Sequence, residues 1–172
     1  MLRAVTDDLA SRLLAASELR GDFVLSSGRR SSVYFDKFRF LTDPDLLKET
    51  AHAVAELLPE GITRLAAPEG AATLLVAAVA LETGMPIAVV RKEPKAYGTR
   101  SQVEGDVAAG AQVALIEDVS TTGHQVHAAA KVLEATGCQV GIIVLAIDRG
   151  GAEHLRDAGY WVKSVVEVRP AD

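Results

Sequence analysis

With 172 residues, 49% of them hydrophobic, and a formal net charge of −5 at pH 7, the chain has the composition of one folded globular domain over 1–172. The acidic balance argues against a nucleic-acid partner, and the apolar stretch 66–80, which contains Glu69, is too short for a membrane span of ~20 residues. The single cysteine, Cys138, excludes an intrachain disulfide and suits a cytoplasmic protein.

The N-terminal part predicts a helix followed by short β-prone runs. Residues 4–19 place apolar side chains at mainly helical spacing, whereas 21–40 contain the runs FVL and VYF on either side of SSGRRSS, which favours a hairpin. Asp43 and Pro44 then begin a helix that continues to about Leu58, because proline in the first turn has no amide hydrogen to leave unpaired.

The remainder alternates apolar runs with single helices. Strands are expected at 64–68, 87–90, 113–116, 140–147 and 161–168, and helices at 71–82, 122–135 and 151–158. Apolar strands joined by single helices predict an α/β fold with a parallel sheet covered on both faces. Segment 91–110 fits neither period and is rich in Lys, Arg, Ser, Thr and Gly. An aperiodic loop of this length in a compact domain is typically functional.

The most informative stretch is VALIEDVSTTGHQV, residues 113–126, where an apolar strand runs through two acids into a hydroxyl-rich turn that opens a helix. Backbone amides at a helix N-terminus stabilise an anion, and open α/β sheets bind ligands at the carboxyl ends of their strands. Residues 120–123 are therefore expected to hold a phosphate. Glu117 and Asp118 would accept hydrogen bonds from sugar hydroxyls, because carboxylates repel phosphate.

This stretch resembles the motif of the type I phosphoribosyltransferases, whose hydroxyl-rich loop holds the 5-phosphate of 5-phosphoribosyl 1-pyrophosphate (PRPP). Three further segments resemble the orotate phosphoribosyltransferases within that family. RKEPKAYGTRSQVEG (91–105) is similar to their mobile catalytic loop, GDFVLSSGRRSSVYFD (21–36) to the hood over the base, and AIDRGG (146–151) to the segment whose arginine pairs with the orotate carboxylate. The resemblance covers roughly 21–151.

The resemblance implies a type I phosphoribosyltransferase fold with an N-terminal helix and small hood (1–40) and a mobile catalytic loop (91–110). The activity it implies is transfer of the phosphoribosyl group of PRPP to orotate, giving orotidine 5-phosphate and pyrophosphate in de novo pyrimidine (UMP) biosynthesis. It further implies a cytoplasmic homodimer that shares the loop across its interface. Mg²⁺ is the implied cofactor, held by PRPP and water rather than directly by the protein.

The resemblance also assigns site residues. Catalytic roles fall to Lys95, Glu117 and Asp118. The residues expected to bind PRPP are Arg91, Lys92, Lys95, Tyr97, Glu117, Asp118, Val119, Ser120, Thr121, Thr122, Gly123, His124 and Gln125. Those expected to bind orotate are Tyr34, Phe35, Thr121 and Arg149, and the pyrophosphate turn is expected at Glu69, Gly70, Ala71 and Ala72.

Some positions depart from the family pattern. Ser26 stands where many relatives have a lysine, Tyr97 where a histidine is frequent, and His124 where a small hydroxyl residue is usual. The alternatives are a phosphoribosyltransferase for another base and a non-catalytic PRPP-binding regulator. Arg149 favours a carboxylated pyrimidine, because a guanidinium pairs with a carboxylate through two hydrogen bonds, and Lys95 favours an enzyme.

A metal site is the other alternative at this turn. His124 and His127 are spaced to share one helix face, but third and fourth ligands at zinc spacing are missing from the sequence around them.

Overall fold

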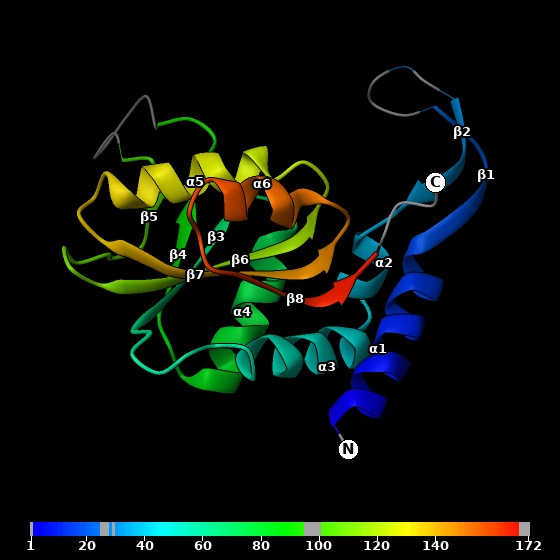
Figure 1. Cartoon of the computed structure of the whole chain (residues 1–172), viewed down its shortest axis with the longest axis horizontal. Coiled ribbons are helices and arrows are strands. Elements are labelled where there is room, and N and C mark those ends of the chain that lie inside the picture. The colour runs from blue at the N-terminus through cyan, green and yellow to red at the C-terminus, as the bar shows by residue number, and fades with distance from the viewer. Residues whose placement is uncertain (1, 25–27, 29, 95–100, 169–172) are drawn as a thin grey trace.

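The computed structural model describes residues 2–24, 28, 30–94 and 101–168. An α/β body surrounds a central sheet, with the N-terminal helix and a hairpin at one end (Figure 1). Within the described residues, no helix is both long and apolar enough to cross a membrane.

The central sheet has six strands in the order β5-β4-β3-β6-β7-β8. Its parallel strands are β3 (Arg64–Pro68), β4 (Ile87–Val90), β6 (Gln112–Ser120), β7 (Gln139–Asp148) and β8 (Val162–Glu167). Each lies where an apolar run predicted a strand, so the predicted α/β fold with a parallel sheet is confirmed.

The edge strand β5 (Val103–Glu104) pairs antiparallel with β4 and was not predicted. It lies inside segment 91–110, which the sequence marked as a loop throughout. Val103 is buried against the sheet, and the backbone N–H of Arg91 donates to the carbonyl of Gln102. A strand of two residues with one buried valine has no periodic pattern from which it could be predicted. The buried valine nevertheless holds this segment against β4.

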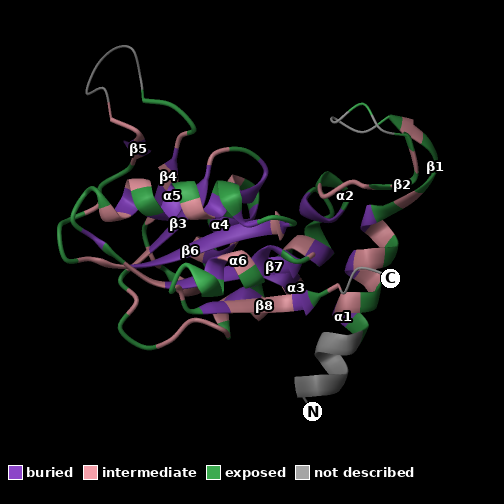
Figure 2. Cartoon of the chain, turned by 45° about the horizontal axis from the view of Figure 1, so that its top comes forward, coloured by how far each residue is buried: buried purple, intermediate pink, exposed green. Residues whose placement is uncertain are grey.

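Helices cover both faces of the sheet (Figure 1). On one face lie α3 (Pro44–Ala55) and α4 (Ala72–Thr83), with α1 (Leu2–Ser17) packed against α3, and on the other lie α5 (His124–Glu134) and α6 (Gly151–Asp157). Buried residues are concentrated on the strands and on the helix faces that meet them (Figure 2). The sheet is therefore apolar on both sides, which explains why its strands lack polar alternation.

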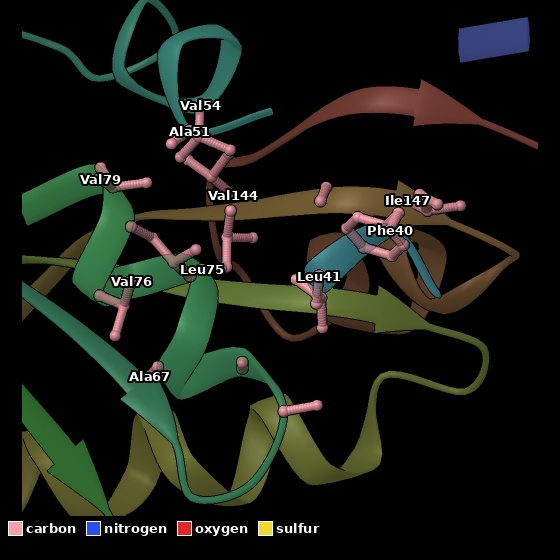
Figure 3. Packing of buried hydrophobic residues seen from close by; sticks show 14 of the residues in the cluster. Phe40, Leu41, Ala51, Val54, Ala67, Leu75, Val76, Val79, Val144 and Ile147 are labelled. Atoms are coloured by element: carbon pink, nitrogen blue, oxygen red, sulfur yellow. The ribbon is translucent and has the colours of Figure 1, made fainter. Parts of the chain in front are cut away.

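The larger core cluster joins α3 and α4 to the sheet. Val54 of α3, Leu75 of α4 and Val144 of β7 are fully buried in it (Figure 3). The short helix α2 (Phe38–Leu41), which the sequence did not predict, inserts Phe40 and Leu41 into the same cluster. Two large buried side chains fix α2 firmly to the body, since each contributes about 1.5–3 kcal/mol by leaving water.

The N-terminal hairpin consists of β1 (Glu18–Val24) and β2 (Arg30–Phe35) and stands beside the sheet as a separate two-stranded unit (Figures 1 and 2). The hairpin predicted within 21–40 is therefore present. The following helix begins as expected, because Asp43 caps α3 by accepting from the backbone amides of Asp45 and Leu46.

Strand β6 extends beyond its predicted end. It was expected to stop at 116 but continues through the two acids to Ser120, because Glu117 pairs in register with Leu145 and Ser120 with Asp148 of β7. Helix α5 correspondingly begins at His124 rather than 122, since Gly123 adopts a left-handed conformation with φ +76°. The turn between strand and helix is therefore shorter than the sequence predicted.

Candidate active site

The two adjacent acids form a buried carboxyl pair at the carboxyl end of β6. The whole Asp118 residue is 0% exposed and Glu117 is 4% exposed, and the backbone N–H of Asp118 donates to Oε1 of Glu117. Burial, reinforced by the neighbouring charge of Asp118, raises the pKa of Glu117 to about 8. At pH 7 Glu117 is therefore mostly protonated and acts as a neutral hydrogen-bonding group.

Lys37 faces this pair, although no sequence pattern pointed to it. Its Nζ donates to Oδ1 of Asp118 at 3.0 Å and lies 3.0 Å from Oδ2. Lys37 and Asp118 are far apart in the chain, and a single lysine after VYFD carries no spacing that points to a site. Only the packing of α2 against the sheet brings the two together.

The predicted phosphate turn lies directly beyond the acids. Thr121 and Thr122 are exposed there, and Gly123 forms the N-cap of α5. The Oγ of Ser120 is buried and has no hydrogen-bond partner in the described part of the chain. A buried hydroxyl without a partner costs free energy unless a ligand or water satisfies it. The turn therefore joins accessible hydroxyls to the N-terminus of an eleven-residue helix, which favours an anion.

The turn is held by the start of α6, a second feature that was not predicted. A Cβ on Gly123 would lie 2.6 Å from the carbonyl of Gly151, and a Cβ on Gly151 would lie 2.0 Å from Oγ of Ser120. Oδ1 of Asp148 accepts from the backbone amides of Gly150 and Ala152. An aspartate that precedes a helix by a few residues is a recognisable capping pattern, so AIDRGG did contain this information.

Arg149 and Phe35, two residues expected to bind the base, lie together. The guanidinium of Arg149 is stacked 4.7 Å from the ring centroid of Phe35, and its backbone N–H donates to the carbonyl of Ser120. Tyr34 is 42% exposed, and its ring contacts Phe23 of the hairpin instead. Successive residues of a strand face opposite sides, so β2 presents Phe35 rather than Tyr34 to Arg149, and a role for Tyr34 stays a prediction.

The predicted pyrophosphate turn lies at the carboxyl end of β3. Gly70 has φ +117°, and Ala71 and Ala72 are buried where α4 begins. Glu69 connects this turn to the neighbouring segment, because its Oε1 accepts from the backbone N–H of Lys92 at 2.8 Å. The structure thus brings the start of the predicted catalytic loop to the pyrophosphate turn.

The basic residues of that loop are described only in part. The side chain of Lys92 is exposed, and that of Arg91 lies 3.7 Å from Glu104 on β5. Lys95 and Tyr97 lie outside the described residues, as does Ser26. Their predicted roles stay predictions.

At the other end of the phosphate turn three histidines lie together. Nδ1 of His127 lies 3.0 Å from Nε2 of His154, and the rings of His124 and His154 meet edge to face with centroids 4.5 Å apart. Among the residues that the structure describes, no group of three or more His, Cys, Asp or Glu side chains is arranged to hold a metal ion.

Two further residues are expected to bind PRPP. Val119 is half-buried and Gln125 is exposed.

A curated orotate phosphoribosyltransferase of Thermococcus gammatolerans is 42% identical to this chain over 168 residues, which cover 94% of the chain and 89% of that protein. This chain belongs to the orotate phosphoribosyltransferase family. The crystal structure of the orotate phosphoribosyltransferase from Aeropyrum pernix matches with a TM-score of 0.76 and 35% identity, covering 98% of this chain and 94% of that one.

A further solved member of the orotate phosphoribosyltransferase family contains PRPP. It is the enzyme of Mycobacterium tuberculosis H37Rv, with a TM-score of 0.79 and 25% identity over 95% of this chain and 96% of that one. No protein-family model matches the chain. The family and the fold expected from the motif around Glu117 and Asp118 are both confirmed.

Proposed function

We propose that this chain transfers the phosphoribosyl group of PRPP to orotate, giving orotidine 5-phosphate and pyrophosphate in the synthesis of UMP. The observation that carries this proposal is the meeting of three features at one edge of the sheet. The buried acids Glu117 and Asp118 end β6, the phosphate turn follows them, and Arg149 with Phe35 lies at the end of β7. Membership of the orotate phosphoribosyltransferase family supports the same reaction.

The acid pair would hold the ribose while the phosphate turn holds its 5-phosphate. The Asp118 carboxylate accepts a hydrogen bond from a ribose hydroxyl, and neutral Glu117 can both donate and accept. Departure of pyrophosphate leaves positive charge on the sugar ring. A buried carboxylate close to that ring stabilises the charge more strongly than water would.

Positive groups would stabilise the departing pyrophosphate. Arg91, Lys92 and Lys95 are the candidates, together with the backbone amides of the turn at Gly70. The oxygens of pyrophosphate are hard ligands of the kind that Mg²⁺ prefers, and Mg²⁺ commonly binds through substrate phosphates and water with few protein ligands. When bound, the ion would neutralise charge on the leaving group.

The base would lie between the hairpin and the end of β7. Arg149 would pair with the carboxylate of orotate through two hydrogen bonds, while Phe35 supplies an apolar surface beside it. Orotate reacts as an anion, so the step needs no general base from the protein.

We also infer a homodimer in which Lys95 acts in the partner's site. Helix α4 gives this inference some support, because it is apolar around its circumference and leaves Leu81 90% exposed and Leu74 41% exposed. An exposed apolar helix face is typical of a protein interface. The location that we propose for the chain is the cytoplasm.

The proposed reaction is tested by measuring pyrophosphate release from PRPP in the presence of Mg²⁺ with orotate, uracil, adenine or hypoxanthine. Of the four bases, we expect only orotate to support pyrophosphate release. We also expect this release to stop when a chelator removes the metal ion. Release with uracil or a purine instead would assign another base. If PRPP bound calorimetrically but no base supported release, the chain would be a PRPP-binding regulator.

A further inference from the structure

Lys37 occupies a rigid place between the hairpin and the body. It is the N-cap of α2, whose Phe40 and Leu41 are 0% and 1% exposed in the core. On its other side, the backbone N–H of Asp36 donates to the carbonyl of Ser17 at 2.8 Å. The backbone of Lys37 is thus fixed from both directions, so its side chain reaches the sheet edge from a defined position.

The Lys37 ammonium group meets both oxygens of the Asp118 carboxylate. Nζ lies 3.0 Å from Oδ1, to which it donates, and 3.0 Å from Oδ2. Oδ1 also accepts from the backbone N–H of Val119. Oδ2 is buried and accepts no hydrogen bond from the described residues. One oxygen of the carboxylate is therefore fixed by two donors, while the buried Oδ2 lacks a hydrogen-bond donor among the described residues.

The charges around this carboxylate make Lys37 its principal cation. Glu117 lies next to it on β6, and the charges of Asp118 and Lys37 act on the pKa of Glu117 in opposite directions. Other charged or titratable side chains on the surrounding elements include Asp36 before α2 and Arg39 on α2, Asp148 and Arg149 at the end of β7, Arg64 on β3, Glu69 and Glu82 near the two ends of α4, and His124, His127, Lys131 and Glu134 on α5.

Several of these charges have other partners. Asp148 accepts from the amides of α6, Glu69 from the amide of Lys92, Glu82 contacts His52, and Arg149 lies over Phe35. A buried carboxylate without a nearby opposite charge is costly. In the described residues, Lys37 is the cation that forms an ion pair with Asp118.

We propose that Lys37 is a positioning residue for phosphoribosyl transfer, whose ammonium group orients the Asp118 carboxylate toward the ribose. The inference rests on the proposed function. Lys37 would act through Asp118 rather than by touching the reacting atoms.

The same short segment also reaches the base site. Phe35 lies two positions before Lys37 and stacks on Arg149, while Lys37 holds Asp118. Residues 35–37 therefore join the group expected to bind the orotate carboxylate to the group expected to bind the sugar. A shift of this segment on base binding would be transmitted to the Asp118 carboxylate.

The test compares Lys37→Met, which removes the charge at similar size, with Lys37→Arg, which retains it. Lys48→Met on the exposed surface of α3 is the control for loss of a lysine charge. We expect Lys37→Met to lower kcat about tenfold or more with little change in KM for PRPP or orotate, because the contribution is made in the transition state. Lys37→Arg should recover most of kcat, and Lys48→Met should behave as wild type.

A second readout needs neither substrate. Carboxyl ¹³C NMR titration of the free protein follows Glu117, with Glu117→Gln to assign its resonance. The pKa of Glu117, about 8 in the wild type, should rise in Lys37→Met and return in Lys37→Arg, because a positive charge favours the ionised form. Thermal melting shows whether each variant folds. If Lys37→Met does not fold, Lys37→Gln is used in its place.

The outcomes separate the two proposals. An unchanged Glu117 titration, or an unchanged kcat in folded Lys37→Met, would overturn the positioning role. A rise in KM with unchanged kcat would also overturn it, since Lys37 would then bind a substrate directly. A wild-type protein without transferase activity would refute the proposed function, while the Glu117 titration would still report on the ion pair.

Discussion

Burial makes the two adjacent carboxyl groups of β6 chemically unequal. Asp118 has an ammonium group within hydrogen-bonding distance, whereas Glu117 has the amide of its neighbour and a raised pKa. Burial and the neighbouring charge favour a proton on Glu117, whereas Asp118 forms an ion pair with Lys37. The raised pKa of Glu117 contributes to the way in which the stability of the protein depends on pH.

Replacing Glu117 by glutamine should make the folded protein progressively more stable than the wild type as the pH rises from about 5 to 8. In the unfolded chain Glu117 loses its proton near its ordinary value of 4.5, but in the folded chain the pKa is about 8. Between these values the folded state binds more protons, so wild-type stability falls with rising pH. Each pKa unit corresponds to about 1.4 kcal/mol of unfolding free energy.

Melting temperatures of both proteins across this pH range provide the measurement, with Glu60→Gln as an exposed control. A constant difference in Tm at all pH values would show that Glu117 ionises normally in the folded state.

Arg149→Ala should weaken orotate binding far more than PRPP binding. The substitution removes the guanidinium that would pair with the carboxylate and leaves the phosphate turn in place. A charge-assisted pair contributes roughly 1.5–3 kcal/mol, which corresponds to about ten- to a hundredfold in affinity. Calorimetric titration with each ligand separates the two effects, and equal losses for both would contradict the assignment.

At the scale of elements, the phosphate turn depends on its contact with α6. Gly123 has φ +76° and approaches the backbone of Gly151, so any side chain there meets both conformational strain and a clash. Gly84 at the end of α4 has nearly the same φ, +72°, with no atom within 4 Å of the position that a Cβ would take. Substitutions at these two glycines can therefore be compared to separate the effect of backbone strain from the effect of close packing.

Gly123→Ala should therefore abolish most PRPP binding, whereas Gly84→Ala should only lower stability. Both substitutions place alanine in the left-handed region, at a cost of roughly 1–2 kcal/mol. Only the first moves the turn away from α6. Thermal melting measures the loss of stability that both variants share. Calorimetric titration with PRPP measures the loss of binding that we expect only in Gly123→Ala. Wild-type affinity in a folded Gly123→Ala protein would remove this turn from the phosphate site.

At the scale of the whole molecule, each site is proposed to need two chains. If Lys95 acts in the partner's site, a mixed dimer of Lys95→Ala and Arg149→Ala subunits contains one site with both lesions and one with neither. Random exchange of equal amounts makes about half of the dimers mixed, so roughly a quarter of all sites are intact by two-fold symmetry.

Refolding the two impaired variants together should therefore give more activity than either variant shows when it is refolded alone. Differently tagged chains confirm that exchange has taken place. If exchange occurs without any gain in activity, Lys95 acts within its own subunit and the shared-loop proposal is wrong.

The sequence by itself determined the α/β class, the parallel strands, and the family motif around Glu117 and Asp118. These follow from local pattern, because the apolar runs and the strand–acid–turn–helix order involve residues close together in the chain. The same is true of the hairpin and of the helix capped by Asp43.

The tertiary structure decided which side chains meet. Pairing with β7 extends β6 through the two acids to Ser120. The alternation of side chains along β2 places Phe35 against Arg149. The packing of α2 places Lys37 next to Asp118, although the two are 81 residues apart in the chain. No local pattern encodes such contacts, because they depend on which buried surfaces pack together. The charge balance of the acid pair is therefore a property of the folded chain alone.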